Sequence, residues 1–218
     1  MLRVFASGIV VNITNMSPRQ QLCAGRLPLR LLTLFAGLTL FALAGALLIR
    51  AGLGVNPWNV FHIGVASIVP LSLGTVVIIT GCVVLLGWIP LRQWPGLGTV
   101  CNAIWIGLAL DRFLAVLPPV HGWPWQVGML LLAIAVNGLG GAMYIGSHFG
   151  PGPRDGLMTG LHLRTGLSIR LVRTGLELGA LSVGWLLGGP VGLGTLAFAV
   201  LIGPSTQFFF RYTIIALP

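Results

Sequence analysis

The chain contains one stretch twice, and this duplication constrains its fold more than any other feature. Displacing the sequence along itself, without a gap, places these residues opposite each other: Gly54 and Gly150, Pro57 and Pro153, Gly64 and Gly160, and the tetrapeptides Gly96–Thr99 and Gly192–Thr195. In this register, residues 30–111 and 126–207 share roughly 20 identities over about 82 positions, where about 7 would arise by chance. We therefore predict two repeats of one structural unit.

The composition places these repeats in a membrane. Hydrophobic residues make up 56% of the chain and charged residues only 7%, with a mean hydropathy of +0.98. A soluble globular domain has about a quarter of its residues charged, so that class is excluded. At about 20 residues per span, the chain has room for roughly six to eight membrane helices and no additional soluble domain.

The net charge of +9 comes from arginine, which supplies all 12 basic residues. Most of these arginines flank apolar runs, which is typical of membrane topology and of contact with anionic lipid headgroups. We therefore expect membrane lipids as partners and no nucleic acid. Cys23, Cys82 and Cys101 show no metal-binding or disulfide spacing, so no metal or cofactor is expected.

Six apolar runs are long enough to cross a membrane: Leu31–Ile49, Leu71–Ile89, Leu97–Leu117, Val127–Ile145, Leu167–Leu187 and Leu193 to about Phe210. Tryptophans near the run ends are predicted to form an interfacial belt: Trp88, Trp94, Trp123, Trp125 and Trp185. The predicted organisation is a leader (1–29), repeat 1 (30–111), a periplasmic connection (112–125), repeat 2 (126–207) and a cytoplasmic tail (208–218).

The arginines also predict the orientation. With the N-terminus in the cytoplasm, these arginines lie inside: Arg3, Arg19, Arg26, Arg30, Arg92, Arg154, Arg164, Arg170, Arg173 and Arg211. Only Arg50 and Arg112 then lie outside, which favours cytoplasmic N- and C-termini. Each repeat has three spans, an odd number, so the second repeat enters the membrane from the opposite side. The predicted fold is therefore all-α, with six transmembrane helices in two inverted three-helix repeats.

The duplicated motif predicts a short helix after the first span of each repeat. Pro57 and Pro153 suit the first helical turn, and the preceding Asn56 and Gly152 are acceptable N-caps. We expect these helices to end near Val69 and Thr165, about 20 Å from their starts and too short to span. They are either re-entrant, with N-termini meeting near the midplane, or flat at the interface. Re-entrant N-termini would attract an anion or a carbonyl group.

Charged residues inside the apolar regions are the candidate functional groups. Glu177 lies deep in the fifth span, where Arg173 can reach it as a buried packing pair or as part of an anion or proton path. Arg154 opposes the helix dipole at its position and therefore needs a carboxylate or bound anion. The candidate binding residues are Asn56, Pro57, Trp58, Asn59, Pro153, Arg154, Asp155, Arg173 and Glu177. Asp111 is expected to neutralise Arg50 or Arg112.

The sequence favours a transporter or channel for a small, anionic solute over other functions. No nucleophile–base pair, zinc motif or phosphate-binding loop is present, so no catalytic residue is predicted and an enzyme is not expected. The alternative is a non-transporting membrane protein that assists assembly or secretion through a protein partner. A lipid-modifying or lipid-moving role, and self-association into a homo-oligomer, stay open.

Three segments resemble the bacterial YczE/YitT-type membrane protein family. They are GLGVNPWNV (Gly52–Val60), GPGPRDGLMTGL (Gly150–Leu161) and RTGLSIRLVRTGLE (Arg164–Glu177), followed by GLGT at Gly192. The resemblance implies a multi-pass protein of the bacterial cytoplasmic membrane with no assigned enzymatic activity. The chain is similar to the smaller, YczE-like form, which does not carry the soluble C-terminal domain of YitT-type members.

Overall fold

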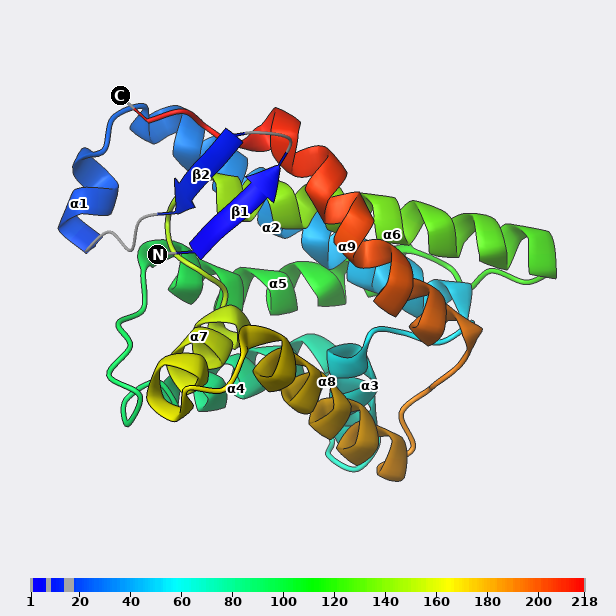
Figure 1. Cartoon of the computed structure of the whole chain (residues 1–218). Coiled ribbons are helices and arrows are strands. Elements are labelled where there is room, and N and C mark those ends of the chain that lie inside the picture. The colour runs from blue at the N-terminus through cyan, green and yellow to red at the C-terminus, as the bar shows by residue number, and fades with distance from the viewer. Residues whose placement is uncertain (1, 7–8, 14–17, 218) are drawn as a thin grey trace.

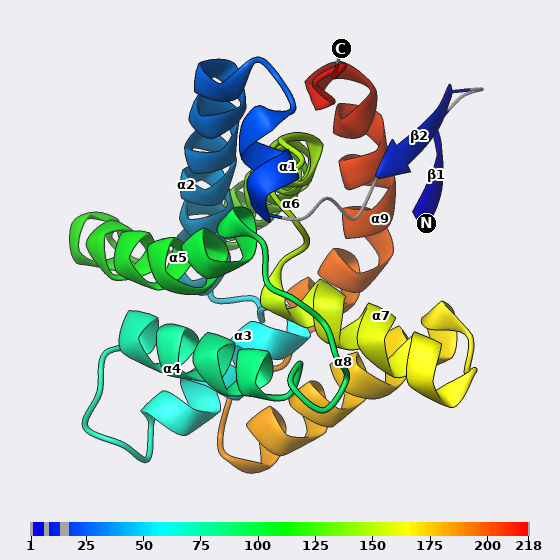
Figure 2. The ribbon, with the colours of Figure 1, turned by 90° about the vertical axis from the view of Figure 1, so that its left-hand side faces the viewer.

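The computed structural model describes residues 2–6, 9–13 and 18–217, and these form a helical assembly with one small hairpin (Figures 1 and 2). In chain order the elements are β1 (Leu2–Ala6), β2 (Ile9–Ile13), α1 (Pro18–Cys23), α2 (Leu27–Ala51), α3 (Pro57–Ala66), α4 (Leu73–Leu86), α5 (Leu97–Val116), α6 (Trp123–Gly146), α7 (Pro153–Thr165), α8 (Ile169–Leu186) and α9 (Leu193–Thr213). The strands β1 and β2 pair antiparallel, with Leu2 opposite Ile13.

Each predicted span is occupied by a helix. Four of them, α2, α5, α6 and α9, are long and apolar enough to cross a membrane. The apolar α4 has 14 residues, about 21 Å of helix, and α8 has 18 residues that include Arg170, Arg173 and Glu177. The chain is therefore a helical membrane protein with four candidate membrane spans among the described residues.

The centre of the assembly is the pair α2 and α6, the first long helix of each repeat. A Cβ atom on Gly37 of α2 would lie 2.6 Å from the backbone nitrogen of Tyr144 on α6. A Cβ on Gly140 of α6 would lie 2.7 Å from the carbonyl oxygen of Gly37. Glycine on both helices therefore lets the two backbones touch. Helix α5 packs beside α2, and α9 packs beside α6 (Figure 2).

The two short helices cross over to the opposite repeat. Helix α3 of repeat 1 packs chiefly on α8 of repeat 2, and α7 of repeat 2 contacts α4 and α5 of repeat 1 as well as α8. Gly184 of α8 meets the backbone of Val60 and Phe61, whereas Gly156 of α7 receives the ring of Trp88. Both crossings therefore depend on close approach at glycine, on α8 in one case and on α7 in the other.

The glycine-rich loops before the short helices dock on the Gly-Leu-Gly-Thr tetrapeptides of the opposite repeat. The backbone N–H of Gly194 donates to the carbonyl of Leu53 at 2.7 Å, and that of Gly98 donates to the carbonyl of Phe149 at 2.9 Å. Leu53 and Phe149 occupy equivalent repeat positions, as do Gly98 and Gly194. The two repeats therefore make the same contact reciprocally.

Arg30 fixes the second of these loops in place. Its side chain is fully buried, stacks 4.4 Å from the ring centre of Phe149, and donates to the carbonyls of Ser147 and His148 at 2.9 and 3.1 Å. A third bond reaches the carbonyl of Gln21 in α1 at 2.6 Å. Satisfying its donors on backbone carbonyls makes the buried guanidinium tolerable. Arg30 thus joins the leader, α2 and the loop that precedes α7.

The third and fourth helices of each repeat pack differently in the two copies. In repeat 1, α4 lies along α5, with Gly74 against Gly107, and Asp111 accepts from the Gly74 N–H at 2.7 Å and from Ser72 Oγ at 2.6 Å. In repeat 2, Arg170 replaces the first glycine, and the described part of the chain has no comparably extensive contact between α8 and α9. The expected neutralisation of Arg50 or Arg112 by Asp111 is therefore wrong, because this carboxylate caps α4.

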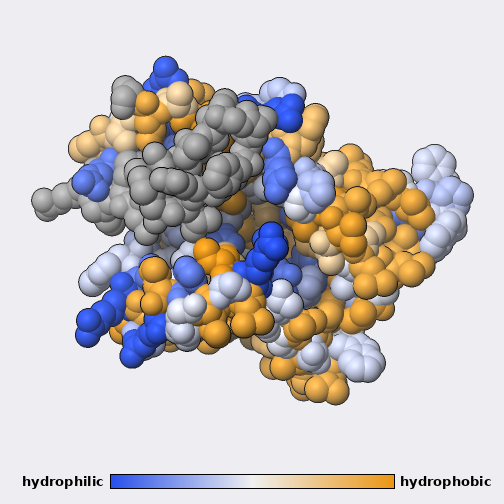
Figure 3. All heavy atoms as spheres, in the orientation of Figure 1, coloured by the Kyte–Doolittle hydropathy of each residue, from blue (hydrophilic) through white to orange (hydrophobic). Residues whose placement is uncertain are grey.

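The tryptophan belt is confirmed in part. Trp94, Trp123, Trp125 and Trp185 are each more than half exposed, as interfacial residues should be. Trp88 is only 2% exposed, and its indole N–H donates to the carbonyl of Pro153 at 2.9 Å. Apolar side chains dominate the end of the molecule formed by α6 and α9 (Figure 3).

Replacing Gly54 by alanine tests the docking of the glycine loops. Gly54 has a φ of 104°, and its Cβ would lie 2.6 Å from the backbone nitrogen of Gly192. We expect Gly54→Ala to lower the free energy of unfolding by at least about 1–3 kcal/mol, the cost of a strained backbone conformation alone. Gly203→Ala is the control, because nothing lies within 4 Å of its Cβ position. Equal thermal midpoints for the two variants in detergent would contradict the docking argument.

Candidate functional site

The first turns of α3 and α7 meet at the centre of the molecule. The guanidinium carbon of Arg154, the second residue of α7, lies 4.5 Å from the ring centre of Trp58, the second residue of α3. Trp58 and Arg154 occupy equivalent positions of the two repeats. The first turns of α3 and α7 therefore contact each other through an aromatic ring and a cation.

The local sequence explains how each helix begins. Asn56 is the N-cap of α3 and accepts the backbone N–H of Asn59 at 2.8 Å, while Pro57 supplies a first-turn residue that needs no N–H partner. Gly152 and Pro153 occupy the same positions in α7. Asn56, Pro57, Asn59 and Pro153 therefore shape and orient the site.

Of the two predicted C-terminal ends of the short helices, one is correct and one is wrong. Helix α7 ends at Thr165 as expected, but α3 ends at Ala66 and not at Val69. Pro70 follows Val69, and a residue before proline is disfavoured in helical geometry. Ser67 closes the helix instead, donating through its hydroxyl to the carbonyl of Gly64 at 2.7 Å.

Arg154 carries a positive charge that no neighbouring carboxylate neutralises by direct contact. Asp155 accepts instead from the hydroxyl of Tyr144 at 2.8 Å, and the described residues provide no hydrogen bond or ion pair for the Arg154 guanidinium. The carboxylates of Asp155 and Glu177 act on Arg154 only as nearby charges. One face of the guanidinium stacks on Trp58, which leaves its edge of N–H donors available for an anion.

His62 is a site residue that sequence reasoning missed. It lies one helical turn after Trp58 on α3, with ring centres 6.4 Å apart, and its side chain is 0% exposed. Within the described residues, neither of its ring nitrogens has a hydrogen-bond partner. Arg154 is close enough for its charge to act on the imidazole. His62 belongs to no recognisable motif, yet its i+4 relation to Trp58 places both residues on one face of α3.

Arg173 and Glu177 form the predicted ion pair, but not in the predicted environment. Arg173 Nε donates to Glu177 Oε1 at 2.9 Å, with side chains 58% and 39% exposed. The interpretation of a buried packing pair is therefore wrong, because both side chains are partly exposed. Glu177 still contributes negative charge to the surroundings of Arg154.

The resulting site combines a stacked cation, a buried imidazole and two helix N-termini. Such groups bind anions, because each presents positive charge or unsatisfied N–H donors. Two surface cavities, of about 440 and 360 Å³, lie elsewhere, and neither is lined by Trp58, His62 or Arg154. The part of the chain that the structure covers has no cluster of three or more His, Cys, Asp or Glu suited to a metal.

Comparison with known proteins identifies relatives that cover most of the chain. The model of a family of unknown function, DUF6198, matches residues 28–211. The chain is 41% identical over 176 residues to an uncharacterized protein of Haemophilus influenzae, covering 81% of this chain and 80% of that protein. It is 35% identical over 177 residues to the uncharacterized membrane protein YczE of Bacillus subtilis, covering 80% and 82%. No solved structure matches the chain.

The residues matched by the family model include both glycine-rich loops, both tetrapeptides and the positions of Trp58 and Arg154. The family model and the similarity to YczE confirm the resemblance drawn from the duplicated motif, and the Bacillus subtilis relative is itself described as a membrane protein. The chain therefore belongs to the DUF6198 family and is a YczE-like membrane protein.

Proposed function

We propose that this protein is a transporter or channel for a small anionic solute in the bacterial cytoplasmic membrane. In this proposal the solute binds where α3 and α7 meet, between Trp58, His62 and Arg154. The observation that carries the proposal is Arg154, a cation stacked on an aromatic ring with no direct carboxylate partner among the described residues. The protein performs no covalent chemistry on the solute, and its partners are the solute, membrane lipids and a further copy or another protein.

The proposed topology has six spans, α2, α4, α5, α6, α8 and α9, in two inverted repeats, with both termini in the cytoplasm. The distribution of arginines supports this orientation, because only Arg50 and Arg112 fall on the outer side. The reciprocal bonds from Gly98 to Phe149 and from Gly194 to Leu53 support a two-fold relation between the repeats. In this arrangement α3 and α7 are re-entrant and approach the midplane from opposite faces.

An anion at this position would relieve two electrostatic costs. The Arg154 guanidinium would gain the charged hydrogen bonds that it otherwise lacks. The His62 imidazole would gain a partner for a donor that burial leaves unsatisfied, a deficit that costs about 1–3 kcal/mol. The dipoles at the first turns of α3 and α7 add further attraction. Each contribution favours a small oxyanion or carboxylate over a neutral solute.

The two repeats pack differently, and this difference supports a solute path that is closed on one side of the membrane. Asp111 ties α4 to α5 in repeat 1 by bonds to Ser72 and Gly74. The matching pair α8 and α9 has no such tie, because Arg170 and Gln207 replace Gly74 and Asp111. Inverted-repeat transporters work by exchanging closed and open packing between equivalent halves.

The alternative function is a non-transporting accessory protein that assists assembly or secretion through a protein partner. It is favoured by the position of the two cavities, neither of which reaches Trp58 or Arg154. A reproducible co-purifying protein, together with unchanged biological activity in an Arg154→Gln variant, would support this alternative over transport.

Removing the charge of Arg154 tests the transport proposal. Purified protein in liposomes is expected to carry at least one anion from a panel of carboxylates and small oxyanions. Arg154→Gln is expected to reduce this flux at least about tenfold, equivalent to about 1.4 kcal/mol of lost interaction. Arg112→Gln, which changes an exposed arginine of α5, is the control and should leave flux unchanged. No flux with any anion, or equal flux in both variants, would overturn the proposal.

Replacing His62 by leucine separates binding from folding. Leucine removes a buried polar ring without partners, so the thermal midpoint of the solute-free protein is expected to stay equal or rise. Flux of the transported anion should nevertheless fall several-fold, because one donor is lost. A stable variant with parental flux would exclude His62 from the site.

Labelling of single cysteines tests the orientation. In a variant whose native cysteines are replaced by alanine, His121→Cys lies in the predicted periplasmic connection, and Thr165→Cys lies at the end of α7. A membrane-impermeant maleimide added to intact cells is expected to label the first and not the second. Labelling of Thr165→Cys from outside would reverse the proposed orientation.

A further inference from the structure

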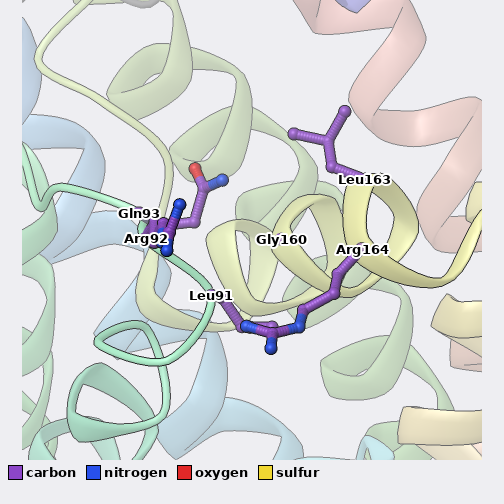
Figure 4. Close-up of a pocket in the computed structure, with 6 residues that line it drawn as sticks. All are labelled: Leu91, Arg92, Gln93, Gly160, Leu163 and Arg164. Carbon is purple, nitrogen blue, oxygen red and sulfur yellow. The ribbon is translucent and has the colours of Figure 1, made fainter.

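A surface cavity of about 440 Å³ lies between the C-terminal half of α7 and the turn that joins α4 to α5. Its lining residues are Leu91, Arg92, Gln93, Gly160, Leu163 and Arg164. Figure 4 shows Arg164 extending from α7 toward the turn that carries the other polar residues. Two cationic side chains and an amide thus converge on this cavity from segments far apart in the sequence.

Arg92 occupies a backbone position that ordinarily belongs to glycine. Its φ is 54°, in the left-handed region, and the turn around it closes with two bonds: Arg92 N–H to the Ile89 carbonyl at 3.1 Å, and Gln93 N–H to the Trp88 carbonyl at 3.1 Å. Helices often end in this way, with glycine at the left-handed residue because it has no Cβ to strain. Arginine at this position therefore carries a backbone strain that glycine would avoid.

The second repeat supplies a comparison inside the same chain. Gly188 is the counterpart of Arg92, with φ 89°, and the same two bonds recur: Gly188 N–H to the Trp185 carbonyl at 2.9 Å, and Gly189 N–H to the Gly184 carbonyl at 2.8 Å. Gly189 and Ile68 are the counterparts of Gln93 and Arg164. None of the three polar side chains that line the cavity is therefore present at the equivalent positions of the other repeat.

The fold holds Arg164 over the cavity while leaving most of its donors available. One guanidinium nitrogen of Arg164 donates to the Pro90 carbonyl, which ties α7 to the turn. The cavity has an apolar rim in Leu163, which is 71% exposed, and Trp94, the residue after Gln93, is 87% exposed. Cations beside exposed apolar and aromatic residues are typical of a protein surface at the lipid headgroup level.

We propose that this cavity binds a phosphate group, supplied by the headgroup of an anionic phospholipid. Guanidinium groups match phosphate oxygens in shape and charge, and two of them with one amide can hold a phosphodiester from both sides. Basic pockets between membrane helices bind anionic headgroups in the same way. The site is separate from the one at Trp58 and Arg154 and does not depend on transport. The equivalent positions at the other end of the molecule lack these polar side chains, so we expect no phosphate site there.

The test uses the full-length protein, delipidated in a nonionic detergent, with three additions: phosphatidylglycerol, phosphatidylcholine at the same concentration, and inorganic phosphate against chloride at matched ionic strength. Phosphatidylglycerol is expected to raise the thermal midpoint by several degrees and to stay bound in native mass spectrometry, because a ligand that binds only the folded state stabilises it. Phosphatidylcholine, which is zwitterionic, should do neither. A shift with inorganic phosphate alone would also support the phosphate site and would assign it a soluble ligand.

The decisive variant is Arg92→Gly, which installs the residue of the second repeat. It should lose most of the shift caused by phosphatidylglycerol, while its lipid-free midpoint stays equal or rises, since glycine relieves the backbone. Arg164→Ile, the other exchange between repeats, should lose the shift as well. Arg170→Gln changes an exposed arginine of α8 outside the cavity, and this variant should keep the shift caused by phosphatidylglycerol. A parental shift in Arg92→Gly, or no shift with either phosphatidylglycerol or phosphate in the parent, would overturn the proposal.

Discussion

The structure depends on two reciprocal backbone hydrogen bonds, one donated by each repeat to the other. The N–H groups of Gly98 and Gly194 belong to the first turns of α5 and α9, where no helical partner exists for them. The carbonyls of Phe149 and Leu53 accept them and thereby fix the loops that lead into α7 and α3. An unpaired N–H would be costly inside a membrane protein, so this pairing satisfies a requirement of helix ends while it locates the site.

Fixing the loops in this way determines where the short helices begin. Each loop ends at a capping residue and a proline, so Trp58 and Arg154 follow within one turn and are brought together. Arg30 strengthens one of the two loops through Phe149 and the carbonyls around it. The candidate site is therefore held by backbone contacts on both sides and by the Asn56 cap of α3, and Trp58, His62 and Arg154 are not needed for that support.

Much of the architecture could be predicted because the duplication repeats the residues that act through the backbone. Glycines, prolines and caps appear at equal spacing in both halves, and their effects on chain direction are local. The parts that could not be predicted depend on contacts between distant segments. The sequence around Trp88 is typical of a membrane interface, yet Trp88 is buried because Gly156 makes room for its ring. His62 carries no motif, and only the fold shows that it is buried without a partner beside Trp58.

The contact between Trp58 and Arg154 requires the two repeats to differ in sequence at the point where they meet. In a dimer of two identical halves, the residue at the two-fold axis meets its own copy. Arginine would then face arginine across the axis and be repelled, whereas tryptophan would face tryptophan and leave no charge. A cation stacked on an aromatic ring needs unlike residues at the two equivalent positions, so two identical halves could not form it. A single chain that carries both repeats can, because each copy has its own residue there.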